Sequence, residues 1–413
     1  MTSDTTLVRL LRASKNLRYY LAVRVAWALG AQMLNIAVGW SIYDRTQSAM
    51  NLGLVGLAQF APSLALSLIA GQASDRFDRR LVLGGSLLVQ AVCAGLFLAF
   101  LLAGSRAVWP IYGLLLLFGS ARTFSAPALS SLLPQLVPAE DFPRAVALGS
   151  SSFQLATIVG PAIGGMLYAW RDAGLLAVIM TLYLVATLLA TRFALQSASA
   201  KKDDASPADT SILAGLRYIR SNPLILGAIS LDMVAVLLGG VTALLPIYAR
   251  DILLVGPIGL GCLRAAPGVG AAVVGFVLAG RPIRGHAGLI MLWCVAGYGV
   301  ATIVFALSTW FWVSLVALIA LGSFDMVSVV IRQTLVQLAT PDAMRGRVSA
   351  VNFIFIGASN QLGEFESGAT AAALGTVPAA AAGGIGTLAV VALWAWWFPA
   401  LRRVDQTDAG LQR

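Results

Sequence analysis

Charged side chains are scarce in this sequence. Asp, Glu, Lys and Arg together make up 11% of its 413 residues, whereas a soluble globular protein contains about 25% of them. Hydrophobic residues make up 59%, and apolar runs of about 20 residues, long enough to cross the hydrocarbon core of a bilayer, recur along the chain. A chain with so few charges needs lipid as its main solvent, so the sequence predicts an all-α polytopic membrane protein.

Histidine and cysteine are scarcer still. His286 is the only histidine, and Cys93, Cys262 and Cys294 lie far apart in separate apolar runs. These residues predict neither a disulfide framework nor a metal-binding motif, and one histidine in a loop leaves no set of nucleophile, histidine and acid for catalysis. The sequence also lacks a Gly-Lys-Ser/Thr loop for nucleotide phosphates. We therefore expect no enzyme, no metal site, no cofactor and no use of ATP.

Positive charge is unevenly distributed. The net charge is +10, and 20 of the 28 Lys and Arg residues fall in the two tails or in alternate predicted loops. The opposite loops contain only Arg45, Arg106, Arg171 and Arg250. Because cytoplasmic loops are enriched in Lys and Arg, both termini are predicted to be cytoplasmic. The charge thus indicates orientation rather than nucleic-acid binding, and the first apolar run, which no cleavage site follows, is expected to be retained.

The apolar runs predict twelve transmembrane helices in two sets of six. Residues 1–194 form an N-terminal six-helix bundle, 195–222 a polar cytoplasmic linker with a short surface helix at Ile212–Ile219, and 223–413 a C-terminal six-helix bundle. Because six is even, both bundles begin on the same side and form a parallel pseudo-twofold repeat. The predicted spans are 19–43, 52–74, 82–103, 108–134, 145–170, 173–194, 223–249, 257–280, 287–308, 310–338, 346–372 and 377–399.

A weak internal repeat supports this division. Residues 138–165 match residues 341–368 at an offset of 203, and both copies contain a loop with Pro, an acid and Arg, followed by an apolar stretch interrupted by glycines. A repeat of half the chain length indicates two equivalent halves. The identities are Pro138/Pro341, Arg144/Arg347, Ala147/Ala350, Gly160/Gly363 and Gly165/Gly368.

The predicted loop between spans 2 and 3 reads Gly-Gln-Ala-Ser-Asp-Arg-Phe-Asp-Arg-Arg from Gly71 to Arg80. This spacing resembles the Gly-x-x-x-Asp-Arg-x-Gly-Arg-Arg signature of the major facilitator superfamily, with Asp78 in place of the second glycine. The resemblance implies the major facilitator fold and a cytoplasmic gate that latches the two halves. The gate would consist of Gly71, Asp75 and Arg76, assisted by Arg79 or Arg80. The alternative is a positively charged membrane anchor.

Span 5 contains a proline among glycines. A proline inside a helix removes a backbone hydrogen bond and kinks the helix. The sequence Gly-Pro-Ala-Ile-Gly-Gly, with Gly160, Pro161, Gly164 and Gly165, resembles the Gly-Pro-x-x-Gly-Gly element of exporters in the same superfamily. The resemblance implies efflux rather than uptake. The alternative is a kink that only lets two helices pack closely.

Ionisable residues near the middle of predicted spans are Arg122 in span 4, Asp232 in span 7 and Asp325 in span 10. Each costs about 2.5–3.5 kcal/mol in hydrocarbon, so such residues normally face a cavity or a partner. We expect a shared cavity in which Arg122 attracts an anion or lowers the pKa of a nearby carboxylate, and Asp232 or Asp325 exchanges a proton. The alternative is a structural ion pair between two helices. Arg24 lies near the cytoplasm and is expected to snorkel.

Span 11 is unusually polar. Asn360 and Glu364 are one helical turn apart on one face, and Glu366 points elsewhere. A buried Glu can exchange a proton near neutral pH, so Glu364 or Glu366 is a second candidate for proton coupling. The alternative is that both are solvated at the outer interface.

Longer stretches resemble one branch of the superfamily. Residues 345–350, 360–368, 122–128 and 133–137 are similar to the branch that includes enterobactin (catecholate siderophore), multidrug, macrolide and nickel exporters. The resemblance implies a monomeric secondary exporter of the bacterial inner membrane that moves a siderophore-like or drug-like molecule by proton antiport and alternating access. The expected partners are a small-molecule substrate, protons and membrane lipid. Alternatives are a lysophospholipid flippase and a metal-ion exporter, although the absence of a His-rich tail disfavours nickel.

Overall fold

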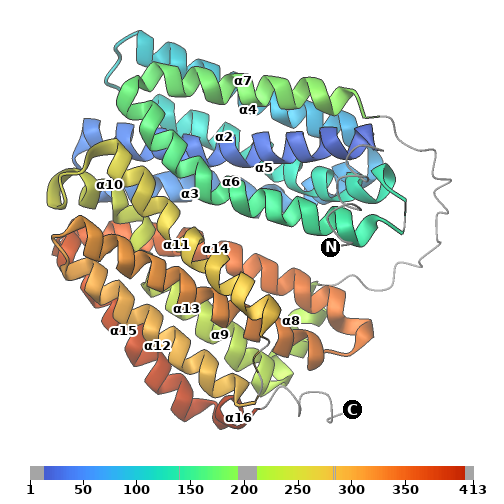
Figure 1. Ribbon diagram of the computed structural model, residues 1–413, viewed down its shortest axis with the longest axis vertical. Helices are drawn as coiled ribbons and strands as arrows, with labels where there is room; N and C mark the ends of the chain where they lie inside the picture. The colour runs from blue at the N-terminus through green and yellow to red at the C-terminus, as the bar shows by residue number, and fades with distance from the viewer. Residues whose placement is uncertain (1–13, 139, 194–211, 282, 284, 405–413) are drawn as a thin grey trace. The chain divides into compact units, whose positions relative to one another are not determined.

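The computed structural model describes residues 14–138, 140–193, 212–281, 283 and 285–404, without the side chains of residues 68, 75, 212 and 343. Within these residues every regular element is a helix (Figure 1). The all-α prediction is therefore confirmed. The linker residues 195–211 lie outside the described residues, and the surface helix expected at its end is present as α8.

The helices of the first half are six long segments. They are α2 (Lys15–Thr46), α3 (Ala49–Arg76), α4 (Arg79–Leu102), α5 (Trp109–Leu136), α6 (Phe142–Trp170) and α7 (Asp172–Thr191). The second half contains long helices and several short segments. They are α8 (Ile212–Ser221), α9 (Pro223–Leu238), η1 (Val241–Leu244), α10 (Leu245–Ile247), η2 (Tyr248–Ile252), α11 (Gly256–Gly280), α12 (Ala287–Leu307), α13 (Phe311–Leu338), α14 (Asp342–Leu374), α15 (Thr376–Trp397) and α16 (Pro399–Arg403).

Ten helical stretches of the described chain are long and apolar enough to cross a membrane, and each overlaps a span expected from the sequence. The helices α5 and α14 coincide with the fourth and eleventh expected spans and are 28 and 33 residues long. These two helices are not among the ten because they are more polar than those ten stretches. The polytopic helical fold is thus confirmed, and the count of twelve spans stays a prediction.

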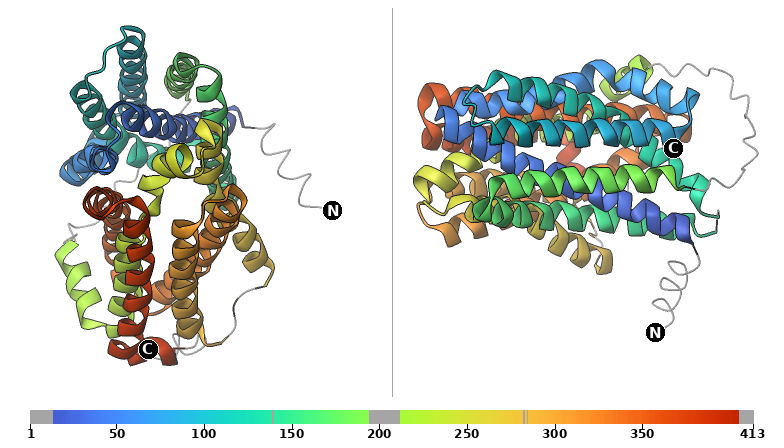
Figure 2. Two further views of the ribbon diagram at one scale, coloured as in Figure 1. Left: turned by 90° about the vertical axis from the view of Figure 1, so that its left-hand side faces the viewer. Right: turned by 90° about the horizontal axis from the view of Figure 1, so that it is seen from above.

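The chain divides into two compact units. Unit 1 consists of Met1–Gln47, Leu57–Lys201 and Gly256–Ala265. Unit 2 consists of Ser48–Gly56, Lys202–Val255 and Ala266–Arg413. The first turns of α3 therefore belong to unit 2, and the first turns of α11 belong to unit 1. Within each unit the long helices run side by side (Figure 2).

Unit 1 is built on helices that bury one face. Helix α2 packs along α6 and α7, and α4 packs along α5 and α7. Leu83 and Leu87 of α4, and Ile179 and Tyr183 of α7, are fully buried at a spacing of four residues. This spacing places each pair on one helical face, which becomes the packed face. Gly30 of α2 leaves room for the Tyr183 ring, since a Cβ there would lie 2.8 Å from it.

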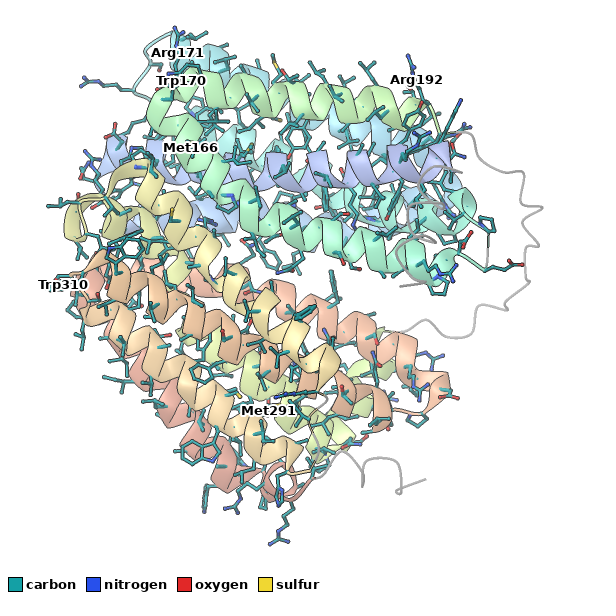
Figure 3. All side chains as sticks on the ribbon, in the orientation of Figure 1. Met166, Trp170, Arg171, Arg192, Met291 and Trp310 are labelled. Carbon is teal, nitrogen blue, oxygen red and sulfur yellow. The ribbon has the colours of Figure 1, made fainter. Side chains whose placement is uncertain are left out.

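Unit 2 has its core between α9, α12, α13 and α15. Leu231, Met291 and Leu335 are almost fully buried in this core, and Leu401 of α16 covers one side of it. Figure 3 labels Met291, and also Trp310, which lies just before α13 and is 74% exposed. Exposed tryptophans at the ends of apolar helices are typical of membrane interfaces.

The seventh expected span is interrupted, although the sequence predicted a continuous helix over 223–249. Helix α9 stops at Leu238, and a 3₁₀ segment, one α turn and a π turn follow Gly239 and Gly240. Two adjacent glycines have the lowest helix propensity of any residues but proline. The Tyr298 hydroxyl of α12 donates to the Gly239 carbonyl oxygen at 3.1 Å, so a backbone group freed by the break is satisfied. A Cβ on Gly240 would lie 2.6 Å from the carbonyl oxygen of Gly363 on α14.

Candidate functional site

Unit 2 contains a buried ion pair between two membrane helices. Asp232 of α9 and Arg332 of α13 form the pair, and their residues are only 7% and 2% exposed. Each charge costs several kcal/mol to remove from water, a cost that only close pairing offsets. This is the structural ion pair considered for Asp232 in the sequence, but its cation is Arg332 rather than Arg122.

Asp325 lies beside this pair. It is seven residues before Arg332 on α13, about two helical turns, and therefore on the same face. Asp325, Asp232, Tyr298 and Ser328 all line one small cavity of about 10 Å³, which is room for about one water molecule. The structure thus brings together both aspartates that the sequence singled out.

The arrangement has a simple charge balance. Two carboxylates and one guanidinium carry a net charge of −1, and a single proton makes the group neutral. Arg332 Nε and Ser328 Oγ are buried and have no hydrogen-bond partner among the described residues. Buried polar groups are normally satisfied, so these two atoms of the cluster are exceptions.

Unit 1 contains a second polar feature, a row of two neighbouring aromatic rings with an arginine at each end. The Arg122 guanidinium of α5 lies 5.7 Å from the centre of the Trp27 ring of α2. That ring lies 6.2 Å from the Phe153 ring of α6, which in turn lies 5.5 Å from the Arg24 guanidinium. Arg24 Nη1 also donates to the Tyr20 hydroxyl at 2.9 Å. Each cation faces a ring at a distance at which cation–π attraction acts.

The row gives Arg24 contacts that the sequence did not predict. Arg24 is expected to snorkel, and in the structure its Nε is buried and its side chain contacts Phe153 and Tyr20. The signal in the sequence was the i, i+4, i+7 spacing of Tyr20, Arg24 and Trp27, which places all three on one face of α2. Arg122 and the two aspartates belong to different units.

The polar residues of α14 make three different contacts. Glu366 Oε1 accepts a hydrogen bond from Thr370 Oγ1 at 2.7 Å, within the same helix. Asn360 Nδ2 donates to a backbone carbonyl of its own helix at 2.8 Å. Glu364 lies beside the first turns of α3, where a Cβ on Gly56 would be 2.7 Å from its carboxylate. Glu364 and Glu366 are both partly buried.

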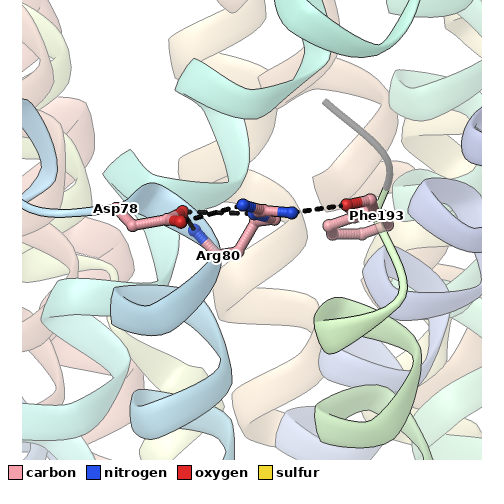
Figure 4. A network of polar contacts seen from close by, with 3 residues as sticks. All are labelled: Asp78, Arg80 and Phe193. Atoms are coloured by element: carbon pink, nitrogen blue, oxygen red, sulfur yellow. Dashed lines mark hydrogen bonds and ion pairs between the residues drawn. The ribbon is translucent and has the colours of Figure 1, made fainter. Parts of the chain in front are cut away.

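The loop between α3 and α4 is shorter than expected. Helix α3 continues through Gly71 to Arg76, and only two residues separate it from the start of α4 at Arg79. Asp78 caps α4: its carboxylate accepts hydrogen bonds from the Arg80 backbone N–H at 2.9 Å and from the Arg80 guanidinium at 3.0 Å (Figure 4). Arg80 also donates to the Phe193 carbonyl at 2.9 Å, after the end of α7. The hydrogen bonds from Arg80 hold the pKa of the Asp78 carboxyl below its usual value.

Asp78, which stands where the superfamily signature has its second glycine, therefore has a structural role. Arg79 is also used inside unit 1, since it donates to the carbonyl oxygens of Ser131 on α5 at 3.0 Å and of Ser74 at 3.3 Å. The Asp75 side chain lies outside the described residues. The described contacts of Arg79 and Arg80 thus fasten the loop to α5 and α7.

The glycines of α6 are places of close helix packing. A Cβ on Gly160 would lie 2.8 Å from the Gln32 side chain, and one on Gly164 would lie 3.2 Å from the Met33 Cα, both on α2. Gly165 packs against Gly261, a residue of α11 that belongs to unit 1. The packing role considered for this motif is therefore observed, with Pro161 inside the continuous helix.

Within the described part of the chain, His, Cys, Asp and Glu side chains nowhere gather in threes as a metal site needs.

Comparisons with known proteins cover most of the chain. A sequence model of the family described as Transmembrane secretion effector matches residues 13–411. The enterobactin exporter EntS of Shigella boydii serotype 18 is 29% identical over 383 residues, which cover 91% of this chain and 90% of that protein. The enterobactin exporter EntS of Escherichia coli O1:K1 is 29% identical over 384 residues with the same coverage.

Solved structures share the fold at low sequence identity. A bacterial homologue of the human lysosomal transporter Spinster has a TM-score of 0.69 at 14% identity, covering 97% of this chain and 98% of that one. The nucleoside transporter NupG has a TM-score of 0.69 at 12% identity, covering 94% and 99%. A bacterial metal transporter has a TM-score of 0.63 at 15% identity, covering 94% and 98%. At these identities the likeness shows the fold alone.

Proposed function

The chain belongs to the transmembrane secretion effector family of the major facilitator superfamily, whose members are transporters rather than enzymes, and from this membership we propose that it exports a small organic molecule by proton antiport. The protein is a multi-pass membrane protein related to exporters of small molecules. The substrate class, the coupling ion and the alternating-access cycle are the proposed part.

The observation that carries the proposal is the row of Arg24, Phe153, Trp27 and Arg122 in unit 1. Two guanidinium groups attract an anion, and the partly exposed Phe153 ring, which packs on the buried Trp27, offers a face on which a planar ring can stack. An anionic molecule with aromatic rings, such as a catecholate siderophore, satisfies both. The relatives named enterobactin exporters support the same substrate class.

The cluster of Asp232, Asp325 and Arg332 supports proton coupling. A transporter that runs on a proton gradient needs a group in the membrane that is neutral in one state and charged in the other. A charge crossing a potential of 100 mV is worth about 2.3 kcal/mol, which is enough to bias a conformational equilibrium. Glu364 and Glu366 of α14 are the other candidates for the coupling group.

We further propose that the protein lies in the bacterial inner membrane with both termini in the cytoplasm. The excess of Lys and Arg in the tails and in alternate predicted loops supports this orientation. The substrate then moves outward from the cytoplasm.

Transport in proteoliposomes tests the proposal. With a pH gradient imposed, a catecholate siderophore should accumulate on the acidic side, and its movement should release protons in the opposite direction. A lipophilic cation, a lysophospholipid and a divalent metal ion serve as competing substrates. Transport of one of these competing substrates instead of the catecholate would refute the substrate class. A transport rate that does not depend on the pH gradient would refute proton antiport.

Matched variants separate the two sites. We expect Arg122→Gln to abolish catecholate transport, with Arg106→Gln, an exposed arginine of the same unit, as its control. We expect Asp325→Asn to uncouple transport from the pH gradient, with the exposed Asp342→Asn as its control. Full coupled activity in Asp232→Asn, Asp325→Asn, Glu364→Gln and Glu366→Gln, each made alone, would contradict the assignment of the coupling group.

A further inference from the structure

Unit 2 contains a pocket that the proposed transport sites do not use. It is lined by residues of α8, α9 and α14 and has a volume of about 670 Å³. Most of its wall is apolar, including Leu216, Met233 and Phe355, and its α8 side carries Arg217 and Arg220. A pocket with an apolar wall and cations on one side fits a molecule with an alkyl chain and an anionic head.

The helix that carries the arginines is firmly attached to unit 2. The Tyr218 hydroxyl donates to the Ala339 carbonyl oxygen at 3.0 Å. Gly215 packs against the backbone of Arg347, so closely that a Cβ there would lie 2.8 Å from its carbonyl oxygen. Ile219 is 1% exposed in a cluster with residues of α9, α13 and α14. The pocket is therefore a fixed feature of the unit.

The other faces of α8 are unusual for a helix in water. Leu213 is 70% exposed and Leu216 is 42% exposed. Arg217 and Arg220 are also exposed, and within the described chain neither one makes an ion pair or a hydrogen bond. A short helix with exposed leucines and unpaired arginines matches a segment that lies in the membrane interface.

The pocket extends from this interface along a membrane helix. Helix α9 begins at Pro223, two residues after α8 ends. Ser230 and Met233 follow at about 10 and 15 Å along α9, at 1.5 Å per residue, and both line the pocket. An alkyl chain entering beside α8 therefore reaches well into the apolar part of the unit.

We propose that this pocket binds an anionic phospholipid. Arg217 and Arg220 hold the phosphate of the headgroup, because one guanidinium group can donate hydrogen bonds to two phosphate oxygens at once. One acyl chain lies between Met233 and Phe355. Basic pockets beside membrane helices are established binding places for anionic headgroups in general, and the excess positive charge of the chain favours an anionic lipid over a zwitterionic one.

Native mass spectrometry of the full-length protein tests this, after purification from nanodiscs of phosphatidylglycerol and phosphatidylcholine. We expect retained phosphatidylglycerol on the wild type and an approximately tenfold or greater loss in the double variant Arg217→Gln/Arg220→Gln, as expected for two basic residues at a membrane surface. The matched control is Arg402→Gln/Arg403→Gln, which removes two exposed arginines of α16 in the same unit.

Two further measurements separate a lipid from a free phosphate compound or another occupant. Met233→Trp fills the apolar part and should also reduce phosphatidylglycerol, while millimolar glycerol 3-phosphate should not displace the lipid. Equal lipid retention in the double variant and its control would overturn the proposal. So would displacement by glycerol 3-phosphate, or a pocket occupied by a second copy of the chain. The readout is bound lipid, so it is independent of the proposed export activity.

Discussion

At the scale of single residues, the ion pair between Asp232 and Arg332 buries two charges away from water. The Arg332 side chain is 2% exposed and the Asp232 side chain 10% exposed. Removing one partner of such a pair leaves the other charge buried and uncompensated, whereas removing both replaces the pair by apolar contacts. Asp325, which lines the same cavity as Asp232, is a carboxylate that can replace Asp232 as the partner of Arg332 but cannot replace the cation.

We predict that Arg332→Met lowers the free energy of unfolding by about 3–5 kcal/mol, because it leaves Asp232 buried without a cation. The double variant Asp232→Leu/Arg332→Met should recover most of that loss. Thermal unfolding of the purified proteins in detergent measures both. A double variant as unstable as the single one would show that the pair does more than balance charge.

Asp78 predicts a dependence of stability on pH. Its carboxylate has a pKa below the usual value because Arg80 donates hydrogen bonds to it. A carboxyl with a lowered pKa in the folded state contributes stability above its unfolded pKa of about 3.9, and that stability is lost as the pH falls through the folded pKa. We therefore expect the wild type to lose stability below about pH 4 relative to Asp78→Asn.

The variant Asp78→Asn keeps a side-chain oxygen that caps α4 but has no charge to titrate, since Asn and Asp are similarly good caps. Asp78→Ala removes the cap as well and should cost about 1 kcal/mol at neutral pH. Thermal melts between pH 3 and pH 7, at low salt, compare the three proteins. Parallel curves for wild type and Asp78→Asn would show that the pair with Arg80 has no effect on stability.

At the scale of elements, close approach of backbones determines where glycine is required. Gly240 and Gly363 let the interrupted seventh span contact α14, and Gly160 and Gly164 let α6 contact α2. Small residues at helix contacts are the usual source of packing in membranes, where lipid removes most of the hydrophobic driving force. Other glycines have open space instead, such as Gly85 of α4, where a Cβ would meet no atom within 4 Å.

We predict that Gly240→Val disrupts unit 2, because its side chain would overlap the backbone of α14, and that it lowers the melting temperature or the yield of folded protein. Gly85→Ala is the control and should be neutral or stabilising by up to about 1 kcal/mol, since alanine is the better helix former. Size-exclusion chromatography and thermal melts compare them. A Gly240→Val variant with the melting temperature and yield of the wild type would mean that the break after α9 can move without cost.

At the scale of the whole molecule, orientation follows from charge. The spans alternate between sides rich and poor in Lys and Arg, and a parallel repeat of two six-helix halves requires the linker and both ends on one side. The transporter family and fold are established by the comparisons, and the sidedness is a prediction that labelling decides.

We predict that Ala205→Cys in the linker and Gln412→Cys near the C-terminus react with an impermeant thiol reagent only from the cytoplasmic side. Ala107→Cys, between α4 and α5, should react only from outside. A protein without its three natural cysteines is the background. Reaction of the first two from opposite sides would refute the parallel arrangement of two six-helix halves.

Much of the fold could be predicted from the sequence because membrane helices are determined locally. A run of apolar residues folds as a helix in lipid whatever its neighbours are, since each backbone group must be satisfied within the segment. The short surface helix α8 followed from its own composition in the same way. The break at Gly239 and Gly240 did not, because a pair of glycines within an apolar run is also compatible with a continuous helix.

The candidate sites were predictable only as residue types. The sequence alone determined that Arg122, Asp232 and Asp325 are costly charges within apolar spans that need partners. Only the tertiary structure decided that Asp232 pairs with Arg332 and that Arg122 lies over Trp27. The physical reason is that apolarity acts within one helix, whereas pairing depends on which faces of distant helices meet, and that is decided by packing over the whole unit.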